Sequence, residues 1–301
     1  MADHTRAGLF LPVLIRAGFL VPVLLFAVAV APADAQGKGN GRGKVKGGSG
    51  PVTSGSAAPA SSGAGIAIRQ FGAWLDDASL LAPGDAWTSI TIGHYRSFAG
   101  SQTDFPVADA GFGITRRTQF GVTVPYYHAR FNDGTSFGGF GDVFLSGKVL
   151  LVEPGDRSIG LAVSPVVEFS RDPLPGQSSI GWGAPLDIEA RLPGFRIFGS
   201  TGYFSRGAVF AAGALEVPIG ERLVATGGLT MMRSTNESPA ADAIGLSKGR
   251  SDITASAAYF LSPTIALFAG TGRTIGNADG TGTNFMLTGG VSFSYAPRLV
   301  Q

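Results

Sequence analysis

The sequence predicts an all-β protein, an antiparallel up-and-down transmembrane β-barrel of about 12 strands. Three observations support this prediction. Only 15% of the 301 residues are charged, whereas soluble domains carry about a quarter. Apolar residues recur at every second position, the period of a β-strand, in runs separated by Gly, Pro, Asn, Asp and Ser. The connections between these runs alternate between tight turns and longer polar segments, as in outer-membrane barrels.

An export signal is expected at the N-terminus, in residues 1–35. Arg6 and Arg16 precede an apolar stretch, and Ala33-Asp34-Ala35 offers the small residues that a signal peptidase reads. The alternative is a retained transmembrane helix. The apolar run is, however, shorter than the about 20 residues that a span requires, and it contains Pro22. Cleavage after Ala35 is therefore expected.

Residues 36–65 are expected to form a disordered linker rich in Gly, Ser and Lys. The segment has hardly an apolar side chain larger than alanine, so it cannot bury enough surface to offset the entropy lost on ordering. Alternatively, it tethers the protein to an anionic envelope polymer or lipid. The cations for such a tether are Lys38, Arg42, Lys44 and Lys46.

Residues 66–85 are expected to be a periplasmic segment that leads into the first strand. The apolar side chains between Ile66 and Leu80 are compatible with a short helix, an extended lead-in or a plug inside the barrel. A short amphipathic cover at the periplasmic mouth is the favoured alternative.

The barrel itself is expected in residues 86–301. In the final run, Phe285, Leu287, Val291 and Phe293 share one face, and small or polar residues share the other. The expected strands are 86–96, 105–114, 118–130, 139–152, 157–170, 179–191, 195–205, 207–217, 222–233, 250–261, 264–274 and 283–296.

Tight turns are expected after the even-numbered strands, for example at Thr115-Arg116-Arg117 and Ser262-Pro263, and longer loops after most odd-numbered strands, for example 235–248. Closure into a ring follows from backbone chemistry, because every amide in hydrocarbon must be paired within the protein. Two outer girdles of aromatic residues are expected. Their members are Trp87, Phe120, Tyr259, Phe293 and Tyr295 near the tight turns, and Tyr95, Phe105, Tyr126, Tyr203 and Phe285 near the loops.

A family resemblance covers the first strands. Residues 79–87 (SLLAPGDAW), 111–126 (GFGITRRTQFGVTVPY) and 139–148 (GFGDVFLSGK) resemble the phenol-degradation meta-pathway (MetA-type) family of outer-membrane transporter barrels. The resemblance implies passage of small, often hydrophobic or aromatic compounds. The resemblance also implies a phenylalanine at the end of the last strand. This chain differs, because residues 296–301 follow Tyr295.

The strand phase turns charged and polar residues toward the lumen. The acids among them outnumber the bases, which favours cations or neutral polar solutes. Alternatively, these side chains only pair with neighbouring strands. The candidate lumen residues are Asp109, Gln119, Asp142, Lys148, Glu168, Asp187, Glu189, Arg191, Glu216 and Asp252. The candidates for an aromatic constriction, or for simple lumen packing, are Phe144, Phe198, Phe210 and Phe260.

No catalytic, cofactor or metal site is expected. The chain has no cysteine, which removes thiol chemistry and cysteine-based zinc sites. A serine hydrolase needs a base, and outside the signal the histidines are His94 and His128. In the twelve-strand phospholipases a serine lies two residues after the histidine, but Arg130 takes that place here. Both histidines are expected to be polar rim residues.

The expected function is therefore a passive outer-membrane channel with both termini in the periplasm. Its expected partners are outer-membrane lipid, lipopolysaccharide and an unidentified small solute, and nucleic acid is not expected. The alternative is a structural or adhesive barrel with a blocked lumen.

Overall fold

The runs of alternating apolar residues fold into strands, and the described part of the chain contains no helix. In the computed structural model, the described residues are 75–97, 100–155, 159–171, 178–205, 207–235, 249–276 and 283–296. The expected signal peptide (1–35), the linker (36–65) and its cations Lys38, Arg42, Lys44 and Lys46 lie outside the described residues. Within those residues, no helix has the length and apolar character needed to cross a membrane.

The described strands belong to a single sheet of fourteen segments. They are β1 (Ala86–Ser97), β2 (Gly100–Thr115), β3 (Thr118–Phe131), β4 (Ser136–Phe140), β5 (Val143–Val152), β6 (Ile159–Val163), β7 (Val166–Phe169), β8 (Ile180–Leu192), β9 (Phe195–Phe204), β10 (Ala208–Ile219), β11 (Leu223–Ser234), β12 (Gly249–Ser262), β13 (Ile265–Gly276) and β14 (Thr283–Tyr295).

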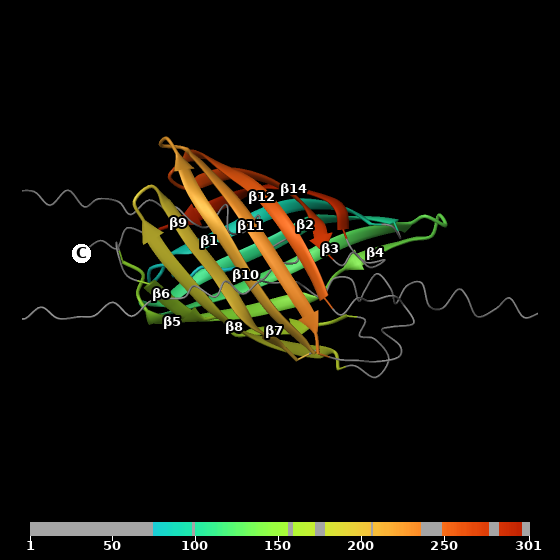
Figure 1. Ribbon diagram of the computed structural model, residues 1–301, viewed down its shortest axis with the longest axis horizontal. Helices are drawn as coiled ribbons and strands as arrows, with labels where there is room; N and C mark the ends of the chain where they lie inside the picture. The colour runs from blue at the N-terminus through green and yellow to red at the C-terminus, as the bar shows by residue number, and fades with distance from the viewer. Residues whose placement is uncertain are drawn as a thin grey trace, which may run out of the picture.

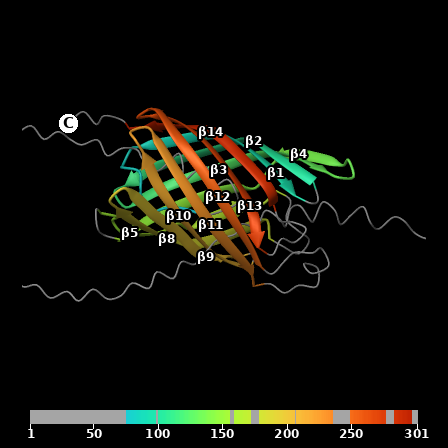
Figure 2. The ribbon, with the colours of Figure 1, turned by 45° about the horizontal axis from the view of Figure 1, so that its top comes forward.

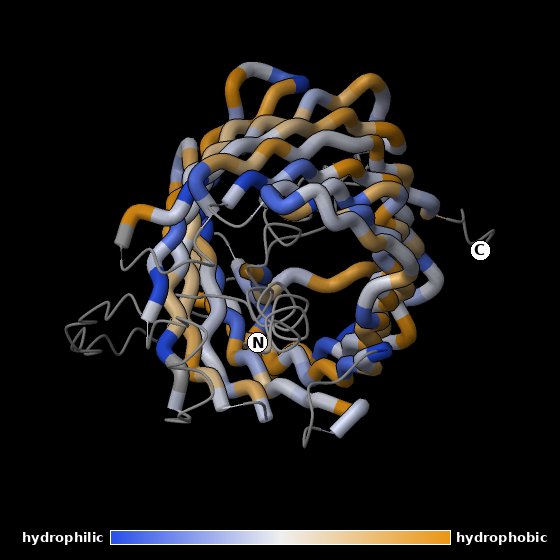
Figure 3. The backbone as a smooth tube through the Cα atoms, turned by 90° about the vertical axis from the view of Figure 1, so that its right-hand side faces the viewer, coloured by the Kyte–Doolittle hydropathy of each residue, from blue (hydrophilic) through white to orange (hydrophobic). Residues whose placement is uncertain are grey.

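The sheet closes on itself as a ring of antiparallel neighbours (Figure 3). The first and last strands pair directly, with Ala86 opposite Tyr295. β4 and β5 both pair with β3, and β6 and β7 both pair with β8, so each of these pairs is one interrupted strand. The β6/β7 break contains Pro165, which has no N–H to donate to the ladder. The barrel therefore has twelve strands, as the sequence predicts.

The strands lean across the long axis of the barrel (Figures 1 and 2), the tilt that closing a sheet into a ring requires. Along β8 the side chains alternate strictly. Trp182 and Ile188 are exposed, whereas Asp187 and Glu189 are fully buried. An outer surface of this apolar character is unfavourable in water and favourable in lipid.

The two ends of the barrel differ in their connections. At one end, which we call the tight-turn end, β8 and β9 are joined by Pro193 and Gly194 alone, and Gly194 has a φ of 87°, which glycine adopts without strain. The paired ends of β1 and β14 also lie there. At the opposite end, the loop end, the β3–β4 hairpin projects beyond the ring (Figure 1).

One expected boundary is wrong by five residues. β2 begins at Gly100, not at 105, so the β1–β2 connection at the loop end is short. The pairing of β2 with β3 is irregular between Asp104 and Val107. This irregularity shifts the phase of the strand, so simple alternation in the sequence does not extend through it.

The outer aromatic girdles are present with two corrections. Eight of the ten expected side chains are exposed on the outside: Phe105, Phe120, Tyr126, Tyr203, Tyr259, Phe285, Phe293 and Tyr295. Trp87 is instead buried inside, in a cluster with Val224, Ala258 and Phe268. Tyr95 also lies on the inward phase of β1, between the exposed residues His94 and Arg96.

Candidate functional site

The described chain begins inside the barrel. We call residues Leu75–Ala82 the strap. It has no regular secondary structure, yet Leu75 and Ala78 are completely buried. The backbone N–H of Asp76 donates to the Ser200 hydroxyl (2.9 Å), and the N–H of Leu81 donates to the Gln119 side-chain oxygen (2.9 Å). The strap therefore runs along the inner wall of the tight-turn half, inside the ring and not as a helical cover across its mouth.

Ion pairs attach the strap to two sides of the lumen. The Lys148 ammonium, on β5, lies 2.8 Å from the Asp76 carboxylate, 3.6 Å from that of Asp77, and donates to the Asp77 carbonyl oxygen at 2.7 Å. Arg196, on β9, lies 2.7 Å from the other Asp77 oxygen. Arg196 also makes two hydrogen bonds to the Glu216 carboxylate, at 3.1 and 2.9 Å. Asp77 thus bridges cations on two different strands.

A second polar contact lies on β8. The Ser79 hydroxyl donates to the fully buried Glu189 carboxylate at 2.6 Å. Arg191 donates to both groups, at 2.7 Å to Glu189 and 2.9 Å to Ser79. Arg196 approaches the same Glu189 at 3.5 Å. Every charged group in this network has an opposite charge beside it, which burial requires.

Apolar side chains of the strap fill three separate clusters on the inner wall. Leu75 packs in a cluster that includes Phe198 and Phe210. Leu80 packs beside Leu150 and Ala162, and Leu81 packs against the cluster that contains Trp87 and Phe268. Leu80 and Leu81 therefore anchor on different parts of the wall, and the strap narrows the tight-turn half of the lumen.

Asp77 is ionised in this setting. Burial by itself raises the pKa of a carboxyl group, but the positive charges of Arg196 and Lys148 outweigh burial and hold the pKa of Asp77 below its ordinary value of 3.8. The strap is therefore negatively charged at neutral pH, opposite the two cations of the wall.

Half of the predicted lumen residues meet the strap or its ion pairs. They come from strands β3, β5, β8 and β10, and the barrel brings them together at the tight-turn end. They are Gln119, Lys148, Glu189, Arg191 and Glu216.

Two of the predicted acids lie elsewhere and tie neighbouring strands together. Asp109 accepts hydrogen bonds from the hydroxyls of Ser89 (3.1 Å) and Thr123 (2.6 Å), on the strands to either side of it. Asp252 accepts a hydrogen bond from the Thr274 hydroxyl of the neighbouring strand β13 at 2.6 Å, and the Arg250 Nε of its own strand lies 3.0 Å from both carboxylate oxygens. Both acids are therefore paired with groups of the wall itself.

The remaining three predicted acids have other surroundings. Asp187 is fully buried and accepts a hydrogen bond from the Ser164 hydroxyl. Asp142 accepts a hydrogen bond from Ser170 at 3.0 Å, where β4 gives way to β5. Glu168, on β7, is half-buried. Of these three, Asp187 lies close enough to Asp76 and Lys148 for their charges to act on it, so it borders the strap's ion pairs.

The predicted aromatic residues divide between two clusters. Phe198 and Phe210 are buried together, and Phe144 packs against them. Phe260 belongs instead to the cluster around Trp87. A single ring of four aromatic residues is therefore not formed.

Sequence reasoning missed the strap's acids and their main partner. Asp76 and Asp77 precede the strands and are far in sequence from Lys148 and Arg196, so no local pattern indicated these ion pairs. Arg196 could have been found, because it lies two residues before Phe198 and shares its inward phase. Arg250 has the same relation to Asp252.

The two histidines lie on the outer face of the barrel. His94 and His128 are both exposed, and the His94 Nδ1 atom lies 3.0 Å from the Thr103 hydroxyl oxygen. Among the described residues, no group of three or more His, Cys, Asp or Glu side chains is arranged to hold a metal ion.

Solved structures with this architecture are outer-membrane barrels. No protein-family model matches the chain, and no curated protein matches it. An outer-membrane channel from Pseudomonas putida F1 is similar with a TM-score of 0.55 and 11% identity, over 73% of this chain and 98% of that one. The NanC porin is similar with a TM-score of 0.52 and 11% identity, over 68% and 98%. At such identities the likeness shows a common fold.

Outer membrane phospholipase A from Escherichia coli is a weaker likeness, with a TM-score of 0.43 and 8% identity over 76% of this chain and 98% of that one. The likeness transfers no activity to this chain. Because no family model matches, the resemblance of the first strands to the MetA-type family stays a prediction.

Proposed function

We propose that this protein is a passive channel for small molecules in the outer membrane, with the tight-turn end in the periplasm. The observation that carries the proposal is the division of the barrel wall into an apolar outer face and a charged, hydroxyl-rich inner face. A water-filled solute path through lipid requires polar groups on its inner wall, and this barrel has them.

Unpaired hydroxyls on the inner wall support a wet lumen. The side-chain oxygens of Thr226, Thr254 and Ser256, on β11 and β12, are buried and find no hydrogen-bond partner among the described residues. Buried polar groups without a protein partner are normally bound to water. Thr226 lies directly opposite Glu216 of β10, so these hydroxyls border the strap's ion pairs.

The strap is the obstacle that a solute meets in the tight-turn half. It is attached by ion pairs, hydrogen bonds and side-chain packing, so its displacement breaks no covalent bond. We therefore propose that solute flow increases when the strap moves away from the wall. The excess of carboxylates in the lining favours cations and neutral polar solutes over anions. Phe198 and Phe210 are buried beside Leu75, so movement of the strap would open their apolar surface to aromatic solutes.

Single-channel conductance in planar bilayers tests the proposal. The matched variants are Gly113→Ala and Gly227→Ala. A Cβ at Gly113 would collide with the Ala82 carbonyl oxygen and lie 2.7 Å from that of Leu81, so it pushes the strap away, whereas a Cβ at Gly227 has nothing within 4 Å.

We expect a cation-selective current from the unmodified protein, a larger current from Gly113→Ala, and no change for Gly227→Ala. Swelling of liposomes in phenol-sized and sugar-sized solutes then defines the solute class. Absence of current and of swelling in all three proteins would overturn the channel and favour a structural or adhesive barrel.

A further inference from the structure

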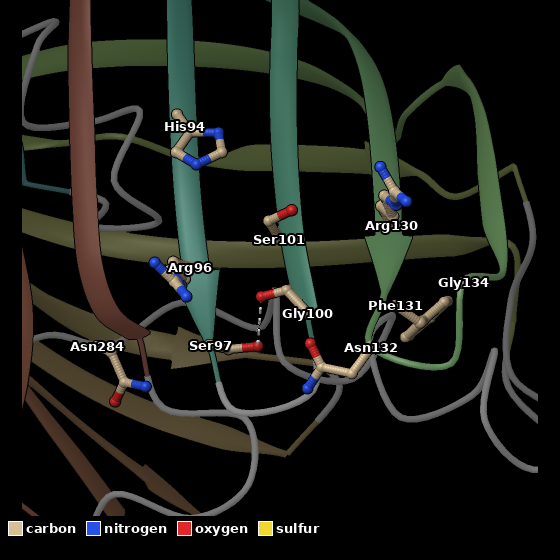
Figure 4. A pocket seen from close by; sticks show the side chains of 10 residues that line it. All are labelled: His94, Arg96, Ser97, Gly100, Ser101, Arg130, Phe131, Asn132, Gly134 and Asn284. Carbon is tan, nitrogen blue, oxygen red and sulfur yellow. Dashed lines mark hydrogen bonds between the residues drawn. The ribbon is translucent and has the colours of Figure 1, made fainter.

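A basic patch lies on the outside of the barrel, at the loop end of β1, β2 and β3. Arg96, Ser101 and Arg130 are direct cross-strand neighbours and form one row across the three strands (Figure 4). His94, Thr103 and His128 form the next row toward the middle of the barrel. The two arginines and the two histidines are exposed. We call these six residues the basic patch.

Among the described residues of the strands around the patch, no carboxylate lies on its outer face. Strands β1, β3, β4 and β14 contain no acidic residue, and the acids of β2, Asp104 and Asp109, are both buried on the inward face. The acid nearest in sequence is Asp133, in the β3–β4 turn, where its carboxylate accepts the Thr135 N–H at 2.9 Å. Directly opposite residues in adjacent strands lie about 5 Å apart, so two guanidinium groups that bracket a serine can reach a common anion.

The surface next to the patch is apolar. One step further from the rim, Ile92, Phe105 and Tyr126 are exposed on the same three strands, with exposed fractions of 47%, 54% and 40%. On the neighbouring strand β14, Phe285 lies opposite Arg96 and Leu287 opposite His94, and both are exposed. The cations therefore lie between the loop-end rim and an apolar belt on the outer face. In a membrane this is the level at which we expect lipid headgroups.

A recess of about 630 Å³ adjoins the patch. His94, Arg96, Ser101 and Arg130 line it together with the amide side chains of Asn132 and Asn284 (Figure 4). Amides and hydroxyls offer hydrogen bonds to sugar hydroxyl groups, and guanidinium groups offer paired N–H donors to phosphate oxygens.

We propose that the basic patch is a binding site for lipopolysaccharide, in which Arg96 and Arg130 hold a phosphate group of the glycolipid and the belt below them contacts its acyl chains. The occupant is a lipid and not a free anion, because the same surface presents cations and, directly below them, exposed apolar side chains. The proposal rests on the loop end facing the outer leaflet. It does not depend on solute passage through the lumen.

Each residue of the patch has a chemical part in this site. A guanidinium group can donate two parallel hydrogen bonds to one phosphate, which a lysine cannot do with the same geometry. The Ser101 hydroxyl between the arginines can donate a further bond. The imidazoles of the second row can donate to phosphate or sugar oxygens that lie deeper in the headgroup.

The test compares the double variant Arg96→Gln/Arg130→Gln with the control Arg233→Gln/Arg273→Gln. The control removes two other exposed outward arginines from the loop half, on β11 and β13, which lie outside the patch. The full-length proteins are placed in lipid nanodiscs, and binding of purified lipopolysaccharide is measured at several salt concentrations. Dephosphorylated lipopolysaccharide and inorganic phosphate serve as the two comparison ligands.

We expect the patch variant to bind lipopolysaccharide on the order of tenfold or more weakly, because two charge-assisted contacts are lost. The control variant should bind like the unmodified protein. Arg96→Lys/Arg130→Lys should keep part of the affinity, because it keeps the charge. Dephosphorylated lipopolysaccharide should bind weakly to every protein, and inorganic phosphate should not compete at millimolar concentration.

Three results would overturn the proposal. The first is an equal loss of binding in the patch variant and the control, which would indicate general electrostatic attraction. The second is unchanged binding in the patch variant. The third is competition by inorganic phosphate as effective as that by the lipid, which would assign the site to a free anion. Circular dichroism of each variant confirms that the barrel has formed. The patch variant should conduct like the unmodified protein, so loss of lipopolysaccharide binding can be distinguished from loss of channel function.

Discussion

Arg196 contacts three carboxylates of the lumen, those of Asp77, Glu189 and Glu216. Its side chain is 10% exposed, and those of its partners are 10% exposed or less. Removing one partner from such a network leaves uncompensated buried charge, which costs more than the pair itself contributes. Arg191 also binds Glu189, but its side chain is 47% exposed and solvent screens its charge.

We expect Arg196→Gln to lower the free energy of unfolding by about 3–5 kcal/mol. Arg191→Gln should lower it by about 1 kcal/mol or less. Urea unfolding of the two variants in lipid vesicles measures the difference. If both variants lost the same free energy of unfolding, the buried Arg196 would stabilise the barrel no more than the exposed Arg191.

The strap is the element whose position depends on charge. Its acids, Asp76 and Asp77, lie opposite Lys148 and Arg196, and its apolar residues fill wall clusters that remain available at any pH. Because the pKa of Asp77 is lowered in the folded protein, its contribution to strap binding is complete above pH 3.8, its ordinary pKa. That contribution is lost as the pH falls through the lowered pKa.

Strap release can be followed with a thiol, because the chain has no cysteine of its own. Ala78→Cys places one at a fully buried strap position. The protein is incubated briefly at each pH, returned to neutral pH and trapped at once with a fast thiol reagent. Labelling of the cysteine should be slow in samples from above about pH 4 and faster in samples from lower pH. Addition of Asp77→Asn should give fast labelling at every pH. Labelling that is slow throughout in this double variant would show that packing alone holds the strap.

At the scale of the whole molecule, the exposed apolar side chains of the outer face determine the position of the barrel in the lipid bilayer. Leu186 lies in the middle of β8 and is 42% exposed, whereas Tyr295 ends β14 at the tight-turn boundary and is 66% exposed. Both side chains point outward, so a substitution at either one changes contact with lipid and not the lumen.

We expect Leu186→Arg to destabilise the barrel by about 2–4 kcal/mol in lipid vesicles, and Tyr295→Arg by about 0–1 kcal/mol, because the cost of a charge depends on its depth in the bilayer. Denaturant unfolding in vesicles measures both values. In detergent micelles, where lipid depth is poorly defined, the difference should shrink. Similar costs in vesicles would contradict a membrane-spanning orientation of β8.

The sequence by itself determined the ring and its outer face. Alternation with a period of two sets which side chains face lipid, and this signal is local, so the expected strand 283–296 matches β14 closely. The same signal fails near Asp104, where a register shift in β2 is set by pairing with β3. Only the tertiary structure decided the position of the strap and the choice of ion pairs. Asp77 and Arg196 are 119 residues apart in sequence, and closure of the ring alone brings their charges within 2.7 Å.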